Sequence, residues 1–313
     1  MKRIAFITTS YPEADGDPSG HFVQTEVLQR ESEGHPVEVI TGRGSAFGWP
    51  GIVARIRQRP RRVFAVLRWV QQATHELRTS EIDHAVAHWA VPCGFPIATR
   101  ALSKEVTLEL VSHGADIRLL LSLPKFARES IVNQLANRAS QWRFVSQALL
   151  ASLCEALAPA TVAKVKRISL VMPSPIAMPE ISARAIVDGF SSQQYAVSVG
   201  RLVKGKRVDV AIAWAANHGI PLAIVGDGPD ERRLEIVAKK MGAKVAWLGK
   251  LPRDEALSWI RDARALVMAS QHEGLSTVVR EAEHLGTKVI DLSEQKNMSP
   301  HREDGSSKVK QVD

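Results

Sequence analysis

The sequence predicts an α/β protein built from two Rossmann-like domains, each with a parallel sheet. Its 313 residues, of which 45% are hydrophobic and 24% charged, are enough to form two modest cores. Short apolar, β-branched runs alternate with helical patterns along most of the chain, which is typical of βαβ units. A proline-rich joint, "VMPSPIAMPE" at 171–180, divides this alternation into two series.

The first series predicts an N-terminal domain over residues 1–172, followed by a linker at 173–192. Helical patterns at 21–35 and 124–140 separate some of its strands. The predicted strands are apolar runs at 3–8, 37–41, 83–88, 108–114, 142–146 and 168–172.

The second series predicts a C-terminal domain over residues 193–292. A helix after 222–226 is marked by Pro229 and acidic residues in its first turn and by Gly242 at its end. From 293 to 313 the chain is polar and has no periodicity, so we expect a disordered or aberrant tail. The predicted strands lie at 195–200, 222–226, 244–249, 265–270 and 288–292.

Composition excludes several classes of protein. The apolar start is too short for a signal peptide, and no run approaches the roughly 18 apolar residues that would cross a bilayer. Cys93 and Cys154 are far apart and lack metal-ligand spacing, which favours a reducing, cytoplasmic setting.

Positive charge is concentrated between Arg43 and Arg78, which contains eight arginines and one acid, Glu76. The favoured interpretation is a solvated helix with one face in the core. The alternative is that Arg55–Arg68 binds an anionic membrane surface or an acidic acceptor, which would place the protein peripherally at the inner membrane face. No nucleic-acid motif accompanies the arginines, so we expect no nucleic-acid partner.

Candidate ligand-binding residues follow the predicted strands, because open α/β sheets bind ligands at the carboxyl ends of their strands. After 195–200, the loop holds Arg201, Lys206 and two more cations, a grouping that suits a diphosphate. The glycine-containing turn that ends at Gly20 is either an anion site or a plain loop. His113, at the end of 108–114, is equally compatible with a structural or a functional role.

The segment "HEGLSTVVREAEHLG", residues 272–286, places two carboxylates around a helix start. Glu273 lies in the loop after a strand, and Glu281 lies inside the helix that Ser276 or Thr277 can cap. Carboxylates accept hydrogen bonds from hydroxyl groups, and the helix N-terminus between them favours negative charge. The simpler interpretation is a helix with scattered surface acids.

Seven motifs in register resemble the retaining family-4 glycosyltransferases of GT-B fold. The resemblance extends from residue 1 to about 290 and includes the spacing of Glu273 and Glu281. The other motifs are "SYPEADGDPSGHFV", "HAVAHW", "VSHGAD", "GRLVKGK", "IVGDGPD" and "WLGKLPRDE". The resemblance implies two domains with sheets that face a cleft. It also implies an enzyme that transfers a sugar from a UDP- or GDP-sugar to a glycan or lipid-linked acceptor in cell-surface polysaccharide synthesis.

The resemblance also implies roles for individual residues. Two cations would hold the diphosphate in place of a metal, so no metal and no other cofactor is expected. Glu273 would contact the donor sugar, Glu281 the ribose, and His113 the transferred sugar. The remaining implied donor contacts are Gly20 at the diphosphate, the backbone of Gly274, Leu275 and Ser276 at the sugar, and Lys250 and Leu251 near the base, with Arg201 and Lys206 as the two cations.

The family pattern breaks down near the C-terminal end. Glu283, His284 and Lys288 stand where the family has small residues, apolar residues and proline, and after Asp291 the resemblance ends. We therefore expect an incomplete second domain, either in a truncated or frameshifted copy or in a short variant completed by a partner. The alternative to an active enzyme is a non-catalytic remnant that binds a nucleotide sugar or a partner. A nicotinamide-dependent oxidoreductase is less favoured because the first turn lacks GxGxxG.

Overall fold

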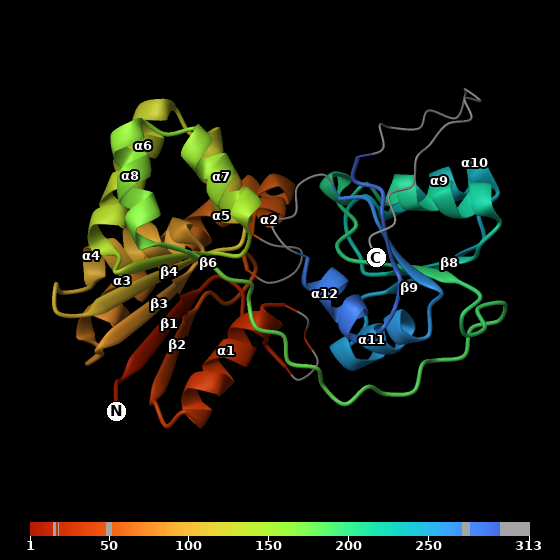
Figure 1. The fold of residues 1–313 in the computed structure, drawn as a ribbon, viewed down its shortest axis with the longest axis horizontal. Helices are drawn as coiled ribbons and strands as arrows, with labels where there is room; N and C mark the ends of the chain where they lie inside the picture. Colours follow the sequence, from red (N-terminus) through yellow and green to blue (C-terminus); the bar gives the residue numbers. More distant parts are fainter. Residues whose placement is uncertain (15–16, 18, 48–51, 271–275, 295–313) are drawn as a thin grey trace. The chain divides into compact units, whose positions relative to one another are not determined.

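The computed structural model describes residues 1–14, 17, 19–47, 52–270 and 276–294. The chain divides into two compact units, Met1–Ala177 (unit 1) and Met178–Asp313 (unit 2) (Figure 1). The predicted tail at 293–313 falls outside the described residues from 295 onward. No helix among the described residues is both long enough and apolar enough to cross a membrane.

Unit 1 contains a parallel sheet whose described strands follow the order β2-β1-β3-β4-β5-β6. All six strands predicted in the first half of the sequence are confirmed, with ends shifted by at most two residues. Their bounds are β1 Ile4–Thr8, β2 Val37–Thr41, β3 His84–His88, β4 Thr107–Ser112, β5 Gln141–Phe144 and β6 Ser169–Val171.

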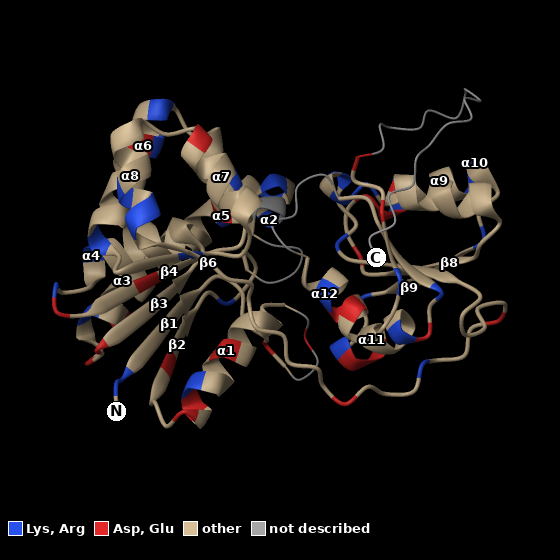
Figure 2. Cartoon of the chain, in the orientation of Figure 1, with Lys and Arg blue, Asp and Glu red and all other residues tan. Residues whose placement is uncertain are grey.

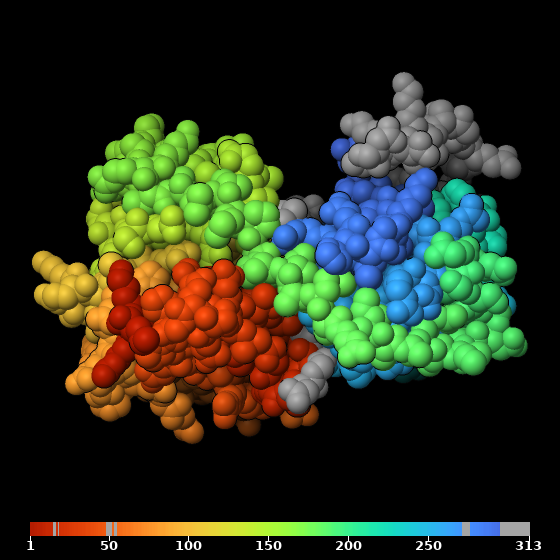
Figure 3. Space-filling view, turned by 60° about the horizontal axis from the view of Figure 1, so that its bottom comes forward, coloured from red at the N-terminus to blue at the C-terminus, as the bar shows by residue number. Residues whose placement is uncertain are grey.

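Helices cover both faces of this sheet. On one face, α1 packs Val23 and Val27 against Phe6 of β1 and Val111 of β4. The larger core lies on the other face, under α3, α6 and α8. In the space-filling view, the N-terminal part of unit 1 (red and orange) and its later part (yellow to green) cover different areas of the visible surface (Figure 3). The helices are α1 His21–Ser32, α2 Ile52–Gln58, η1 Pro60–Arg62, α3 Val63–Thr79, η2 Ala90–Ala98, α4 Thr99–Ala101, α5 Ala115–Ser122, α6 Lys125–Arg138, α7 Gln147–Glu155 and α8 Pro159–Ile168.

Unit 2 contains a second parallel sheet, whose described strands follow the order β11-β10-β7-β8-β9. The five strands predicted in the second half are confirmed. The strands are β7 Ala196–Val199, β8 Leu222–Val225, β9 Val245–Gly249, β10 Ala265–Met268 and β11 Val289–Asp291, and the helices are η3 Lys204–Lys206, α9 Val208–His218, α10 Glu231–Met241, α11 Arg253–Arg261 and α12 Thr277–His284.

Two cores lie on opposite faces of the second sheet. Buried residues of α9 and α10 form one core, and residues of α11 and α12 form the other. Residues 178–192 contain no helix or strand, yet Phe190 is buried against Tyr195 and Trp259. Both units are thus α/β layers, as the sequence predicts. Open sheets of this kind bind ligands at the carboxyl ends of their strands.

Candidate functional site

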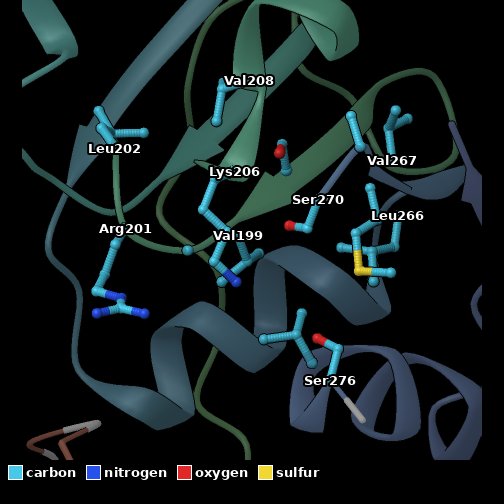
Figure 4. Close-up of a pocket in the computed structure, with 14 residues that line it drawn as sticks. Val199, Arg201, Leu202, Lys206, Val208, Leu266, Val267, Ser270 and Ser276 are labelled. Carbon is cyan, nitrogen blue, oxygen red and sulfur yellow. The ribbon is translucent and has the colours of Figure 1, made fainter. Parts of the chain in front are cut away.

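A small hollow lies at the carboxyl ends of β7 and β10, which are neighbours in the second sheet. Its polar lining comprises Ser198, Arg201, Lys206, Ser270 and Ser276. Figure 4 shows Lys206 and Ser270 pointing toward the same space, with Arg201 at one margin and Ser276 at another. The structure therefore brings together the two predicted diphosphate cations and one predicted backbone donor.

The loop that carries these cations is held by the loop after β8. Leu202 donates its backbone N–H to Asp227 and accepts one from Asp230, at 2.8 and 3.0 Å. Gly226 has a φ of 129°, and a Cβ there would lie 2.0 Å from the carbonyl oxygen of Gly200. Only glycine permits this close approach of two backbones, so the "GDGPD" motif supports the cationic loop.

Two other cations of the loop have different environments. Arg207 is buried and adopts a left-handed conformation, and its guanidinium donates to the carbonyl of Ser293 at 3.1 Å. Lys204 is exposed and does not line the hollow. A Cβ at Gly200 would lie 3.9 Å from Nζ of Lys206, which places that ammonium over the loop backbone.

The hollow is also bordered by the N-terminus of α12. Ser276 is the N-cap residue, one of the two residues that the sequence predicts for that position. Its side chain makes no capping hydrogen bond. The first amides of a helix have no intrahelical partner and favour a negatively charged group nearby. The predicted contacts Glu273, Gly274 and Leu275 lie outside the described residues.

Glu281 lies inside α12 and is only 5% exposed. Arg253 of α11 donates to its Oε1 through Nη2 at 2.7 Å and through Nε at 3.2 Å. This contact orients the carboxylate predicted to bind the ribose. Sequence reasoning missed Arg253, although its place at the start of a helix after "LGKLP" marked it as a residue at a strand's carboxyl end.

Lys250 and Leu251 follow β9, which is separated from β7 by β8. Leu251 packs against the core formed by α11 and α12, whereas Lys250 is exposed. Neither residue lines the hollow between β7 and β10. If these two residues contact the base, as predicted, the base would lie near the end of β9, away from the hollow between β7 and β10.

Unit 1 has its own cluster, which includes the predicted residue His113, at the carboxyl ends of β3 and β4. Nε2 of His113 lies 2.9 Å from Nδ1 of His88, and the two rings stack with an interplanar angle of 10°. The ring of Phe22 lies 4.6 Å from that of His113. Burial and the charge of Arg143 lower the pKa of His113 to about 3, so its imidazole is neutral.

Asp116 fixes the backbone around His113. Its Oδ1 accepts from the backbone N–H groups of His113 and Gly114, and its Oδ2 accepts from that of Ala90 at 2.8 Å. Burial raises the pKa of the Asp116 carboxyl, and these hydrogen bonds oppose the rise. The side chain thereby ties the ends of two neighbouring strands together.

Gly20 begins α1 with a φ of 71° and is buried. A Cβ there would lie 2.2 Å from the carbonyl oxygen of Ser10, so only glycine allows the turn after β1 to pack against the helix start. Phe22, two residues after Gly20, contacts His113. The two predicted residues Gly20 and His113 therefore lie at the same edge of the sheet.

A row of buried charges lies on the α1 side of the sheet. Arg143 of β5 pairs with Glu26 of α1 and, at 3.1 Å, with Glu109 of β4. Burial raises the pKa of the Glu26 carboxyl, and Arg143 opposes that rise. Burial also acts against ionisation of Glu109, but His84 and Arg143 hold its pKa below the usual value. Sequence reasoning missed this row, whose only signal was charged residues at buried positions of predicted strands.

Comparison with known proteins supports the interpretation of unit 2. Residues 183–295 match the family described as "Glycosyl transferases group 1". This segment is similar to a glycosyl transferases group 1 domain. The domain and the fold together support a glycosyltransferase that uses a nucleotide sugar. No curated protein sequence matches the chain.

Solved structures of glycosyltransferases share the fold over 92–93% of this chain. Sucrose-phosphate synthase from Thermosynechococcus elongatus is similar over 93% of this chain and 81% of its own, with a TM-score of 0.63 and 16% identity. HepE from Anabaena, solved with UDP-glucose, is similar over 93% and 80%, with a TM-score of 0.58 and 17% identity. The lipopolysaccharide outer core galactosyltransferase WaaB is similar over 92% and 80%, with a TM-score of 0.56 and 16% identity. These likenesses show the GT-B fold.

Proposed function

We propose that the chain transfers a glycosyl group from a UDP- or GDP-sugar, with the donor diphosphate bound in the hollow between β7 and β10. The observation that carries the proposal is that Arg201, Lys206 and the N-terminus of α12 border one hollow. Two cations and a set of helix amides suit a diphosphate, whose oxygens accept several hydrogen bonds at once. Neighbours of the same fold that were solved with UDP or UDP-glucose support this choice of ligand.

In this proposal the cations act mainly on the leaving group. Negative charge develops on the departing diphosphate, and fixed positive groups lower the energy of that charge separation. The transfer proceeds with retention, through attack on the same face of the sugar, and the leaving phosphate accepts the proton of the acceptor hydroxyl. Neither a metal nor another cofactor is needed, since Arg201 and Lys206 supply the positive charge.

The other predicted residues hold the donor. Glu281, oriented by Arg253, accepts hydrogen bonds from the ribose, and Glu273 contacts the donor sugar. The roles proposed for Gly20 and His113 of unit 1 are contacts with the diphosphate and with the transferred sugar. The backbone of Gly274, Leu275 and Ser276 donates to the sugar, and Lys250 and Leu251 lie near the base.

Titration calorimetry with UDP and with uridine tests the diphosphate site. Replacing Arg201 or Lys206 with alanine should weaken UDP binding about 10- to 100-fold, because each change removes a charge-assisted hydrogen bond. Binding of uridine should change little. Lys204→Ala is the matched control, since Lys204 lies in the same loop but outside the hollow.

Equal losses of UDP and uridine affinity in the Arg201 and Lys206 variants would contradict the assignment. A loss in Lys204→Ala as large as in Lys206→Ala would contradict it as well. Release of sugar from labelled UDP- or GDP-sugars separates an enzyme from a non-catalytic remnant, because the remnant binds the donor without turnover.

The acceptor is a glycan or a lipid-linked sugar of a cell-surface polysaccharide, and the protein works at the inner face of the membrane. This part of the proposal is supported by the surface of α2 and α3, where Phe64 is 70% and Leu67 is 53% exposed. Arginines of α2 and η1 precede these apolar side chains closely in the sequence, and Figure 2 marks basic segments at α2. Apolar side chains among arginines suit the headgroup region of an anionic bilayer.

Sedimentation with phosphatidylglycerol vesicles tests this surface. Changing Arg59, Arg61 and Phe64 together to serine should abolish most of the binding, since both the charge and the apolar contact are lost. A control variant that removes the exposed Lys239 and Lys240 of α10 should still sediment. Equal sedimentation of the first variant and the unchanged protein would refute the membrane partner.

A further inference from the structure

The histidine pair at the carboxyl edge of unit 1 restricts where protons can lie. Nδ1 of His88 and Nε2 of His113 are 2.9 Å apart, so one nitrogen donates and the other accepts. The direction of this hydrogen bond decides which nitrogen of His113 carries its proton. It therefore decides what His113 offers to a ligand.

The other side of His88 faces a carboxylate. Its Nε2 lies 3.7 Å from Oε2 of Glu26, and both side chains are almost completely buried. Arg143 donates to Oε1 of the same carboxylate, and a permanently charged guanidinium favours the ionised form of Glu26. A protonated Nε2 is attracted to that negative charge, whereas a lone pair at Nε2 would be repelled by it.

We propose that Glu26 and His88 are positioning residues that hold His113 in the neutral tautomer with its proton on Nε2, so that Nδ1 accepts a hydrogen bond from a hydroxyl group. With the proton of His88 on Nε2, its Nδ1 is an acceptor, and His113 must donate from Nε2. Nδ1 of His113 is then left with a lone pair. In the structure this nitrogen faces the hydroxyl of Ser174 at 3.5 Å.

Protonation does not disturb this arrangement near neutral pH. Burial lowers the pKa of both imidazoles, and the charge of Arg143 lowers them further, to about 3 for His113. Asp116, a further carboxyl group at this edge, accepts a hydrogen bond from the backbone N–H of His113. His113 therefore supplies an acceptor and no positive charge, and it leaves diphosphate stabilisation to other residues.

The consequence for substrate choice rests on the proposed glycosyl transfer. Nδ1 of His113 would accept from a hydroxyl of the transferred sugar in place of Ser174. A buried acceptor left without a partner is unfavourable, so the site would select a sugar that carries this hydroxyl over its deoxy analogue. This preference for the hydroxyl depends on the tautomer of His113. If Nδ1 of His113 carried the proton, it would donate and would need an acceptor on the sugar.

Nitrogen-15 NMR of the histidine side chains in the full chain, without any nucleotide or sugar, tests the proposal. Signals are assigned by comparison with His113→Gln and His88→Gln. The expected result between about pH 6 and 8 is a protonated Nε2 and an unprotonated Nδ1 on His113. A protonated Nδ1 or an imidazolium would overturn the proposal, and this measurement is independent of whether the chain binds UDP.

Glu26→Gln tests the origin of the tautomer. Removing the carboxylate should produce a mixture of the two His113 tautomers, whereas a purely structural role for Glu26 would leave the nitrogen shifts unchanged. Glu109→Gln is the matched control, because Glu109 also pairs with Arg143 but faces His84 instead of His88. An unchanged tautomer in folded Glu26→Gln, or an equal change in Glu109→Gln, would refute the role of Glu26.

Discussion

Gly226 provides a sharp test of how the cationic loop is held. A methyl group at this position would meet the carbonyl oxygen of Gly200 at 2.0 Å and the carbonyl carbon at 2.9 Å. The two backbones would have to separate, and the hydrogen bond from Gly200 to Val225, at 2.9 Å, lies directly in the affected region. Gly226→Ala should therefore disturb the loop that carries Arg201.

The expected loss has two parts. A residue with a side chain at a φ of 129° costs about 1–3 kcal/mol in backbone strain, and forcing packed groups apart costs about 1–3 kcal/mol more. Gly242 ends α10 with a φ of 63° and has no atom within 4 Å of its Cβ position, so Gly242→Ala should cost only about 1–2 kcal/mol. The loss in Gly226→Ala should exceed that in the control by about 1–3 kcal/mol.

Urea-dependent hydrogen exchange of peptides from β7 and β8 measures this difference, because it reports on unit 2 alone. UDP titration of the same proteins should show weaker binding in Gly226→Ala and little change in Gly242→Ala. The reasoning is refuted if both variants lose the same free energy of unfolding, since the clash with Gly200 would then have no energetic effect.

Three other contacts each carry a quantitative expectation. Arg253→Ala should lower the unfolding free energy by about 3–5 kcal/mol, since it leaves the buried Glu281 without this arginine, and adding Glu281→Gln should restore part of the loss in urea titrations. Ser146→Ala should lower the unfolding free energy by about 1 kcal/mol, because the Ser146 hydroxyl caps α7, whereas Ser276→Ala removes no such bond and keeps the backbone amide, so it should change neither stability nor UDP binding. Below pH 6.5 the unfolded chain protonates His113 and the fold does not, so this residue should make stability fall by about 1.4 kcal/mol per pH unit toward pH 3. His113→Gln should reduce the slope by about that amount in pH-dependent melts, while the buried His88 keeps a contribution of the same sign.

The sequence predicted the strands well because each buried strand is a short β-branched run between helical patterns. β2 was predicted with its observed bounds, Val37–Thr41, and β8 within one residue. Parallel pairing then follows from the helices that connect successive strands, since a crossover returns the chain to the same edge. The carboxyl edges, and thus the places to look for ligand-binding residues, follow from the topology.

The charge pattern alone could not distinguish the roles of the cations within one loop; the resemblance to a family singled out Arg201 and Lys206. Arg201 and Arg207 have similar neighbours in the sequence, but Arg207 is buried and donates to Ser293, while Arg201 borders the hollow. The difference arises because Arg207 adopts a left-handed conformation before α9, which turns its side chain into the unit. That partner is 86 residues away, so no local pattern reveals it.

Glu26 of unit 1 and Glu281 of unit 2 show why the role of a buried carboxylate cannot be assigned without the fold. Glu281 and Glu26 each lie within a helix, and in the sequence each could be a surface acid. In the structure each meets an arginine of another element, Arg253 or Arg143. An arginine held on one side of a carboxylate fixes its orientation, so the other side can act on a third group: His88 for Glu26, and in our proposal a ribose for Glu281. Pairing with arginine therefore argues for a positioned carboxylate in both units, and it makes Arg253 and Arg143 part of the machinery that a sequence motif would leave out.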